Sequence, residues 1–178
     1  MKIIKLMTVA IIMQLVAPLS NAQTIKGPVF DFVETVRVEQ TKPIPKDKVL
    51  KVVYDTYKGA ESGKVNSTFL SAARFINMHV DAGHPQENIN VAIVVHGTTS
   101  LDVTQDDYYA THHNGAKNAN AEVIAALQNQ GVEFYICGQS AAFRGVTKDN
   151  ILPGINFALS AMSAHAMLQS EGYAIIPW

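Results

Sequence analysis

The segment Asn90-Val91-Ala92-Ile93-Val94-Val95 is a continuous apolar run after its first residue, and His96 and Gly97 follow it directly. A strand with one face in water alternates between polar and apolar residues, whereas a continuous run suits a strand that is covered on both faces. Strands of that kind are typical of parallel sheets, which carry helices on both sides. The segment therefore predicts an inner strand of a parallel sheet.

Strands and helices alternate on both sides of this run. Apolar residues at helical spacing, with their start and stop signals, predict helices over residues 66–82, 116–130, 140–143 and 161–170. Short apolar segments between them predict four more strands, over residues 51–55, 132–136, 156–160 and 173–176. This alternation is typical of a three-layer α/β domain with a mostly parallel five-stranded sheet and right-handed crossovers.

Residues 1–22 have the three-part layout of a secretory signal peptide. They begin with Lys2 and Lys5, continue with an apolar run and end in Ser20-Asn21-Ala22. The apolar run is too short to span a bilayer as an anchor. We therefore expect export to the periplasm with cleavage after Ala22, which leaves no membrane anchor on the mature chain.

Two further segments make up the expected mature chain. Residues 23–48 contain Pro43 and Pro45, which favour extended backbone, and short apolar alternations that must pack on something. This stretch predicts an extended N-terminal arm that lies on its own domain or on a neighbour. Residues 49–178 are predicted to form the α/β domain.

The composition excludes several classes of protein. The chain has 178 residues, of which 48% are hydrophobic and 16% charged, as expected of a folded domain. Its formal net charge of −1 offers no basic field that would attract nucleic acid. The single cysteine excludes an intramolecular disulfide and a cysteine-only metal site. Glycine-rich nucleotide motifs are absent and His112-His113 matches no metal-ligand spacing, so we expect neither a cofactor nor a metal ion.

Two of the predicted strands end in residues that can carry chemistry, and ligands of α/β sheets collect at such strand ends. One strand is followed by His96 and another by Cys137. After Cys137 the chain turns into a short helix, whose free N–H groups would favour the thiolate and lower the pKa of the thiol. We expect Cys137 and His96 to act together if their strands are neighbours, which the spacing does not decide. The residues expected to line this site are Gly97, Thr98, Gly138, Gln139, Ser140 and Asn118.

A structural role for the same residues stays open. A free cysteine is often a small buried hydrophobic residue, and burial without donors would raise the pKa of the Cys137 thiol. His96 would then only cap a strand. His165 lies in the last predicted helix, where we expect it at the surface or at an interface.

Several segments together resemble the DsrE/DsrF-like proteins. The resemblance covers residues 51–177, and its motifs are the run from Val123 to Ser140 with Ile136-Cys137-Gly138-Gln139-Ser140 at its end, Leu152-Pro153-Gly154-Ile155, Leu168 to Tyr173, Val94-Val95-His96-Gly97 and Asn118-Ala119-Asn120. The resemblance implies a flavodoxin-like α/β/α domain that assembles into trimers or hexamers. It also implies sulfur carried as a persulfide on a cysteine, for which Cys137 is the one available residue.

Three functions follow from these observations. The leading interpretation is a periplasmic sulfur-handling protein, a persulfide carrier or sulfurtransferase-like protein, in which Cys137 holds sulfane sulfur and His96 supports the anion. Its partners would be a small sulfur-containing donor or an acceptor thiol, and whether it turns over as an enzyme stays open. The first alternative is an oligomeric small-ligand-binding module with a structural cysteine and no catalysis. The second is a flavodoxin-like nucleotide-binding protein that uses the hydroxyl-rich loop from Thr98 to Ser100.

Overall fold

A five-stranded parallel sheet forms the centre of the molecule, in a computed structural model that describes residues 24–177. The strands lie in the order β6-β5-β4-β3-β7, and every neighbouring pair is parallel. Their bounds are β3 (Leu50–Thr56), β4 (Ile89–Val95), β5 (Glu133–Cys137), β6 (Ile155–Ala158) and β7 (Ala174–Pro177). The predicted α/β class is therefore confirmed, with a sheet that is parallel throughout.

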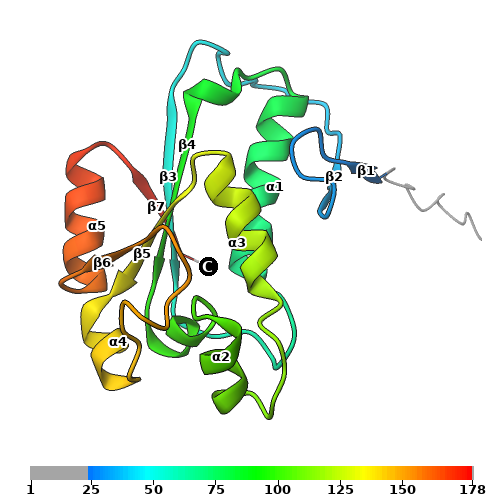
Figure 1. Cartoon of the computed structure of the whole chain (residues 1–178). Coiled ribbons are helices and arrows are strands. Elements are labelled where there is room, and N and C mark those ends of the chain that lie inside the picture. Colours follow the sequence, from blue (N-terminus) through cyan, green and yellow to red (C-terminus); the bar gives the residue numbers. More distant parts are fainter. Residues whose placement is uncertain (1–23, 178) are drawn as a thin grey trace, which may run out of the picture.

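Helices lie on both faces of the sheet, so the domain has three layers (Figure 1). One face carries α1 (Ser67–Asp81) and α3 (Asn120–Asn129), and the other carries α5 (Ala161–Ser170). The shorter helices α2 (Asp106–His112) and α4 (Gly138–Phe143) lie toward the carboxyl ends of the strands. Two short 3₁₀ helices, at Gln86–Asn88 and Gly97–Leu101, complete the elements of this domain. None of the helices between residues 24 and 177 is long and apolar enough to cross a bilayer.

The two faces of the sheet bury cores of different size. Side chains of α1 and α3 pack on β3, β4 and β5 in the larger core, around Phe69, Ile93 and Phe134. The smaller core lies under α5 and contains Val53, Ala92, Val94, Ala164, Leu168 and Tyr173. A single helix of ten residues thus covers the smaller core, next to the strand ends where chemistry was expected.

Local hydrogen bonds explain where the observed elements depart from the predicted bounds. The strand predicted to end at Ser160 stops at Ala158, because the Ser160 side chain accepts from the N–H of Ser163 and caps α5. The helix predicted from residue 116 begins at Asn120, whose N–H donates to the side chain of Asn118. No helix was predicted over α2.

The segment before the sheet packs on its own domain. It contains β1 (Thr24–Lys26) and β2 (Glu34–Val36), which pair antiparallel, and between them Phe30 and Val33 enter the larger core. The buried side chain of Asn77 on α1 accepts from two N–H groups of this segment and donates to the carbonyl of Phe30. The signal peptide predicted over residues 1–22 lies outside the described residues.

Candidate active site

Cys137 ends β5 and His96 directly follows the neighbouring strand β4, and both lie on the same face of the sheet. The register pairs Val95 of β4 with Ile136 of β5, so the next residue of each chain is His96 and Cys137. Val94 faces the α5 side of the sheet, and side chains alternate along a strand, so His96 also faces that side. Tyr135, which packs against the same core, places Cys137 there in the same way. Strand order, which the sequence left open, therefore brings the two residues side by side.

Cys137 is buried, with 6% of its surface exposed, at the junction of β5 and α4. Burial is the largest influence and raises the pKa of the thiol. The backbone and hydroxyl of Ser140 oppose it, together with the backbone N–H groups of Ala161 and Gln139, because these donors stabilise the thiolate. Their sum outweighs burial, so the pKa of Cys137 lies below its ordinary value. The starts of α4 and α5 both contribute to this effect.

Two glycines allow the backbone to approach closely around the thiol. A Cβ on Gly138 would lie 2.6 Å from the carbonyl oxygen of Ala158, at the end of β6. Gly97 has φ +55°, which L side chains rarely adopt, and a Cβ there would lie 2.6 Å from the carbonyl oxygen of Tyr57. Both glycines were expected to line the site, and the structure gives each a steric reason.

Three side chains tie the turn after β4 to α4 and α4 to β6. The N–H of Gly97 donates to the hydroxyl oxygen of Ser140 at 3.1 Å, and Arg144 Nε donates to the carbonyl of Gly97 at 2.6 Å. Gln139 Nε2 donates to the carbonyl of Leu159 at 3.2 Å. The thiol therefore lies among segments that are hydrogen-bonded to each other, namely the turn after β4, α4 and the end of β6. These bonds hold the donors of the thiol in place.

The ring of His96 turns toward β3 and not toward the thiol. Its Nε2 lies 3.1 Å from Oδ1 of Asp55, and among residues 24–177 it makes no hydrogen bond to Cys137. His165 of α5 places its own Nε2 2.7 Å from the same oxygen. Sequence reasoning missed both Asp55 and His165. Of the two places expected for His165, the surface is wrong, because its side chain is only 14% exposed and contacts Asp55 at the strand ends. A place at an interface stays a prediction.

The other two residues expected to line the site have different neighbours. The Thr98 hydroxyl accepts from the N–H of Gly59 and donates to the carbonyl of Tyr57, on the β3 side of the turn. The amide of Asn118 donates to the carbonyls of Asp102 and Thr104, in a buried polar network beneath the loops. The structure thus groups Gly97, Gly138, Gln139 and Ser140 around Cys137 and holds Asn118 in that network.

Asp102 is the ionisable centre of this buried network. Its side chain is fully buried, and one carboxylate oxygen accepts from Asn66 Nδ2 and from the N–H of Ala60. The other oxygen has no partner among the described residues. Burial is the main influence and raises the pKa of Asp102 to about 6, although the two donors lower it.

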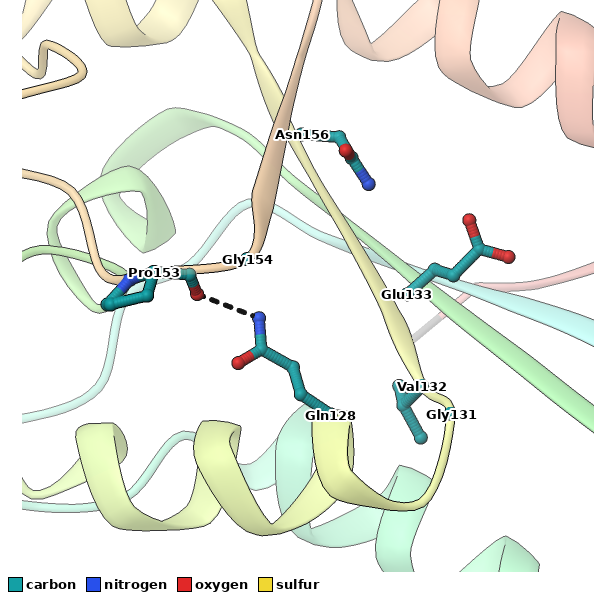
Figure 2. Close-up of a pocket in the computed structure, with 7 residues that line it drawn as sticks. All are labelled: Gln128, Gly131, Val132, Glu133, Pro153, Gly154 and Asn156. Atoms are coloured by element: carbon teal, nitrogen blue, oxygen red, sulfur yellow. Dashed lines mark hydrogen bonds between the residues drawn. The ribbon is translucent and has the colours of Figure 1, made fainter.

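One surface hollow lies at the opposite end of the sheet from Cys137 (Figure 2). It has a volume of about 350 Å³ and lies at the amino ends of β5 and β6, where Gln128 Nε2 donates to the carbonyl of Pro153. Its lining contains the carboxylate of Glu133 but no thiol or imidazole. Among residues 24–177, no group of three or more ligating side chains is arranged to hold a metal ion.

These features define a three-layer, flavodoxin-like α/β protein with a buried thiol at a strand end. The family model of the DsrE/DsrF-like family matches residues 47–178, and the chain belongs to that family. The family expected from the sequence motifs is thereby confirmed. No curated protein sequence matches the chain.

Two solved structures share the fold. One is MTH1491 from Methanobacterium thermoautotrophicum, described as a protein of unknown function, with 20% identity and a TM-score of 0.52. The other is the ychN protein from E. coli, with 14% identity and a TM-score of 0.53. Each similarity covers 72% of this chain and 99% of the other. At these identities the likeness shows the fold alone.

Proposed function

We propose that this protein handles sulfur and that Cys137 carries sulfane sulfur as a persulfide. The observation that carries the proposal is the environment of the thiol, in which the donors of Ser140, Ala161 and Gln139 lower its pKa in spite of burial. A cysteine used only for packing would have burial without such donors and a raised pKa. Membership of the DsrE/DsrF-like family supports the same function.

The proposed chemistry has two steps that conserve oxidation state. The Cys137 thiolate attacks the outer sulfur of a donor R–S–SH, a new S–S bond forms, and the donor's S–S bond breaks with its electron pair leaving on R–S⁻. An acceptor thiolate then attacks the outer sulfur of the Cys137 persulfide, and Sγ leaves as the thiolate. The donors around Cys137 favour the first step by supplying thiolate and the second by stabilising the leaving group.

The proposal includes self-association at the thiol end of the molecule. Three apolar side chains are largely exposed on the segments that surround Cys137. They are Phe143 of α4 at 87%, Leu159 between β6 and α5 at 76%, and Met162 of α5 at 79%. Exposed apolar side chains that gather in this way are typical of interaction sites. We propose that further copies of this chain cover them in a trimer or hexamer. Sedimentation of residues 23–178 as a monomer at micromolar concentration would contradict this.

We propose that the protein acts in the periplasm and that residues 1–22 direct its export as a signal peptide. N-terminal sequencing of protein from the native host is expected to start at Gln23. Retention of Met1 would contradict export with cleavage.

Alkylation and sulfur loading test the function itself. The rate of alkylation of the folded protein should rise with pH through a midpoint below that of free cysteine, with Cys137→Ser as the blank. Incubation with polysulfide should then add mass in steps of one sulfur atom to the wild type and none to the variant. A midpoint above that of free cysteine, with no sulfur uptake, would identify Cys137 as a core residue and support the binding-module alternative.

A further inference from the structure

Two histidine rings contact the same carboxylate oxygen of Asp55, near the carboxyl ends of the strands. Oδ1 of Asp55 lies 3.1 Å from Nε2 of His96 and 2.7 Å from Nε2 of His165. An ionised carboxylate accepts hydrogen bonds and cannot donate them, so both Nε2 atoms carry a hydrogen. Asp55 therefore determines which nitrogen of each ring carries the hydrogen. In both neutral rings this is Nε2, and Nδ1 is left as the acceptor.

The two imidazoles differ in access. The side chain of His165 is 14% exposed, and its Nδ1 is fully buried with no partner among the described residues. The side chain of His96 is 30% exposed, and its Nδ1 is not closed off in the way that Nδ1 of His165 is. A molecule that arrives at the carboxyl ends of the strands can reach His96. It cannot reach His165, whose ring lies between α5 and the sheet. The two rings therefore have different roles.

The cluster lies beside the thiol. Asp55 is the next-to-last residue of β3, His96 follows β4 and Cys137 ends β5. Adjacent strands in this part of the sheet lie about 4.8 Å apart, and the three residues share the face covered by α5. The same helix reaches both groups, because the N–H of Ala161 acts on the sulfur and His165 lies one helical turn further on, on the same side of α5. The packing of α5 thus positions one of the thiol's donors and the carboxylate's second partner together.

We propose that Asp55 and His165 are positioning residues that hold His96 as the base for the acceptor thiol. This inference rests on the proposed function. The proton of R–SH moves to Nδ1 of His96, and the resulting thiolate attacks the outer sulfur of the Cys137 persulfide. The S–S bond breaks with its electron pair on Sγ, the product is R–S–SH, and the proton leaves His96 to water. His165 acts by holding the Asp55 carboxylate in the orientation that fixes the His96 ring.

Single-turnover transfer from the loaded protein to two acceptors tests this role. An aliphatic thiol is mostly protonated at neutral pH and needs a base, whereas an aromatic thiol that is already ionised does not. In Asp55→Asn and His165→Leu, transfer to the aliphatic thiol should fall about 100-fold, a typical contribution of a general base, and transfer to the aromatic thiol should change less than about threefold. His165→Gln should retain most of the wild-type rate, because its amide can still donate to Asp55. Asp81→Asn, which removes a carboxylate paired with Arg37 on another surface, is the control.

A second measurement does not depend on sulfur chemistry. In protein labelled with ¹⁵N at histidine, NMR should show His96 as the Nε2–H tautomer in the wild type and in His165→Gln. Asp55→Asn and His165→Leu should show a mixture of tautomers. Equal loss of transfer to both thiols, or an unchanged tautomer in both variants, would overturn the inference. If the wild type takes up no sulfur, the proposed function fails, and the tautomers still decide whether Asp55 and His165 position His96.

Discussion

The hydroxyl of Ser140 should govern how readily Cys137 ionises. Ser140 acts on the sulfur through its backbone and its hydroxyl, and Ser140→Ala removes only the hydroxyl. A hydrogen bond to a charged group is worth about 1.5–3 kcal/mol, and 1.4 kcal/mol is a factor of ten in an equilibrium. Cys137 is buried, with 6% of its surface exposed, so water is a poor replacement for the lost donor. We therefore expect the thiolate population on the rising part of the pH profile to fall by about tenfold or more.

The rate of reaction with iodoacetamide, followed against pH, measures this change. Loss of a donor to the thiolate raises the pKa of Cys137, so the profile should move to higher pH and keep its plateau, where the thiol is fully ionised. Ser140→Thr retains a hydroxyl and should stay near the wild type, and Ser170→Ala, an exposed serine at the end of α5, is the matched control. A profile that does not move, or that moves to lower pH, would refute a role of the hydroxyl in stabilising the thiolate.

Three further changes test the packing at the thiol, the anchor of the N-terminal segment and the buried polar network. Gly138→Ala places a Cβ 2.6 Å from the carbonyl of Ala158, so we expect a loss of about 1–3 kcal/mol in urea unfolding and slower alkylation of the thiol; unchanged values would refute the close approach. Asn77→Ala removes three hydrogen bonds to the N-terminal segment, two of them with Phe30, and should lower the free energy of unfolding by about 2–4 kcal/mol; a change below about 1 kcal/mol would mean that this anchor contributes little. Burial raises the pKa of Asp102 from 3.8 to about 6, so its contribution to stability is present at low pH and is lost as pH rises through about 6. Asp102→Asn stays neutral and should abolish this loss. Above about pH 6 the variant should therefore be more stable than the wild type by up to about 3 kcal/mol in denaturant titrations. Wild-type stability that rises between pH 3.8 and about 6 would contradict the assignment.

Much of the fold follows from local patterns in the sequence. The run over residues 90–95 is buried on both faces, and its composition predicted the inner strand β4. The last helix was predicted with its observed bounds from its alanine-rich residues, although Ser160, which caps it, was assigned to the preceding strand. The helix α2 was missed because its seven residues, Asp106–His112, are mostly polar and show no clear helical period.

The site was harder to predict because it depends on strand order. His96 and Cys137 were identified from their positions after strands, but their proximity follows from the pairing of β4 with β5. Asp55 was within reach of the same reasoning, since it lies near the end of the first predicted strand. His165 was not, because it meets Asp55 across 110 residues of chain through the packing of α5 on the sheet. No local pattern carries that contact.

The mass of the protein isolated from its native host tests the central claim most directly. If Cys137 carries sulfane sulfur, the intact mature chain should show a fraction with the mass of one or more added sulfur atoms. Peptide mapping should place that mass on Cys137, and a reducing thiol should remove it. Cys137→Ser protein, isolated in the same way, should show none. A native chain of unmodified mass, whose thiol also stays unmodified after exposure to polysulfide, would contradict the account.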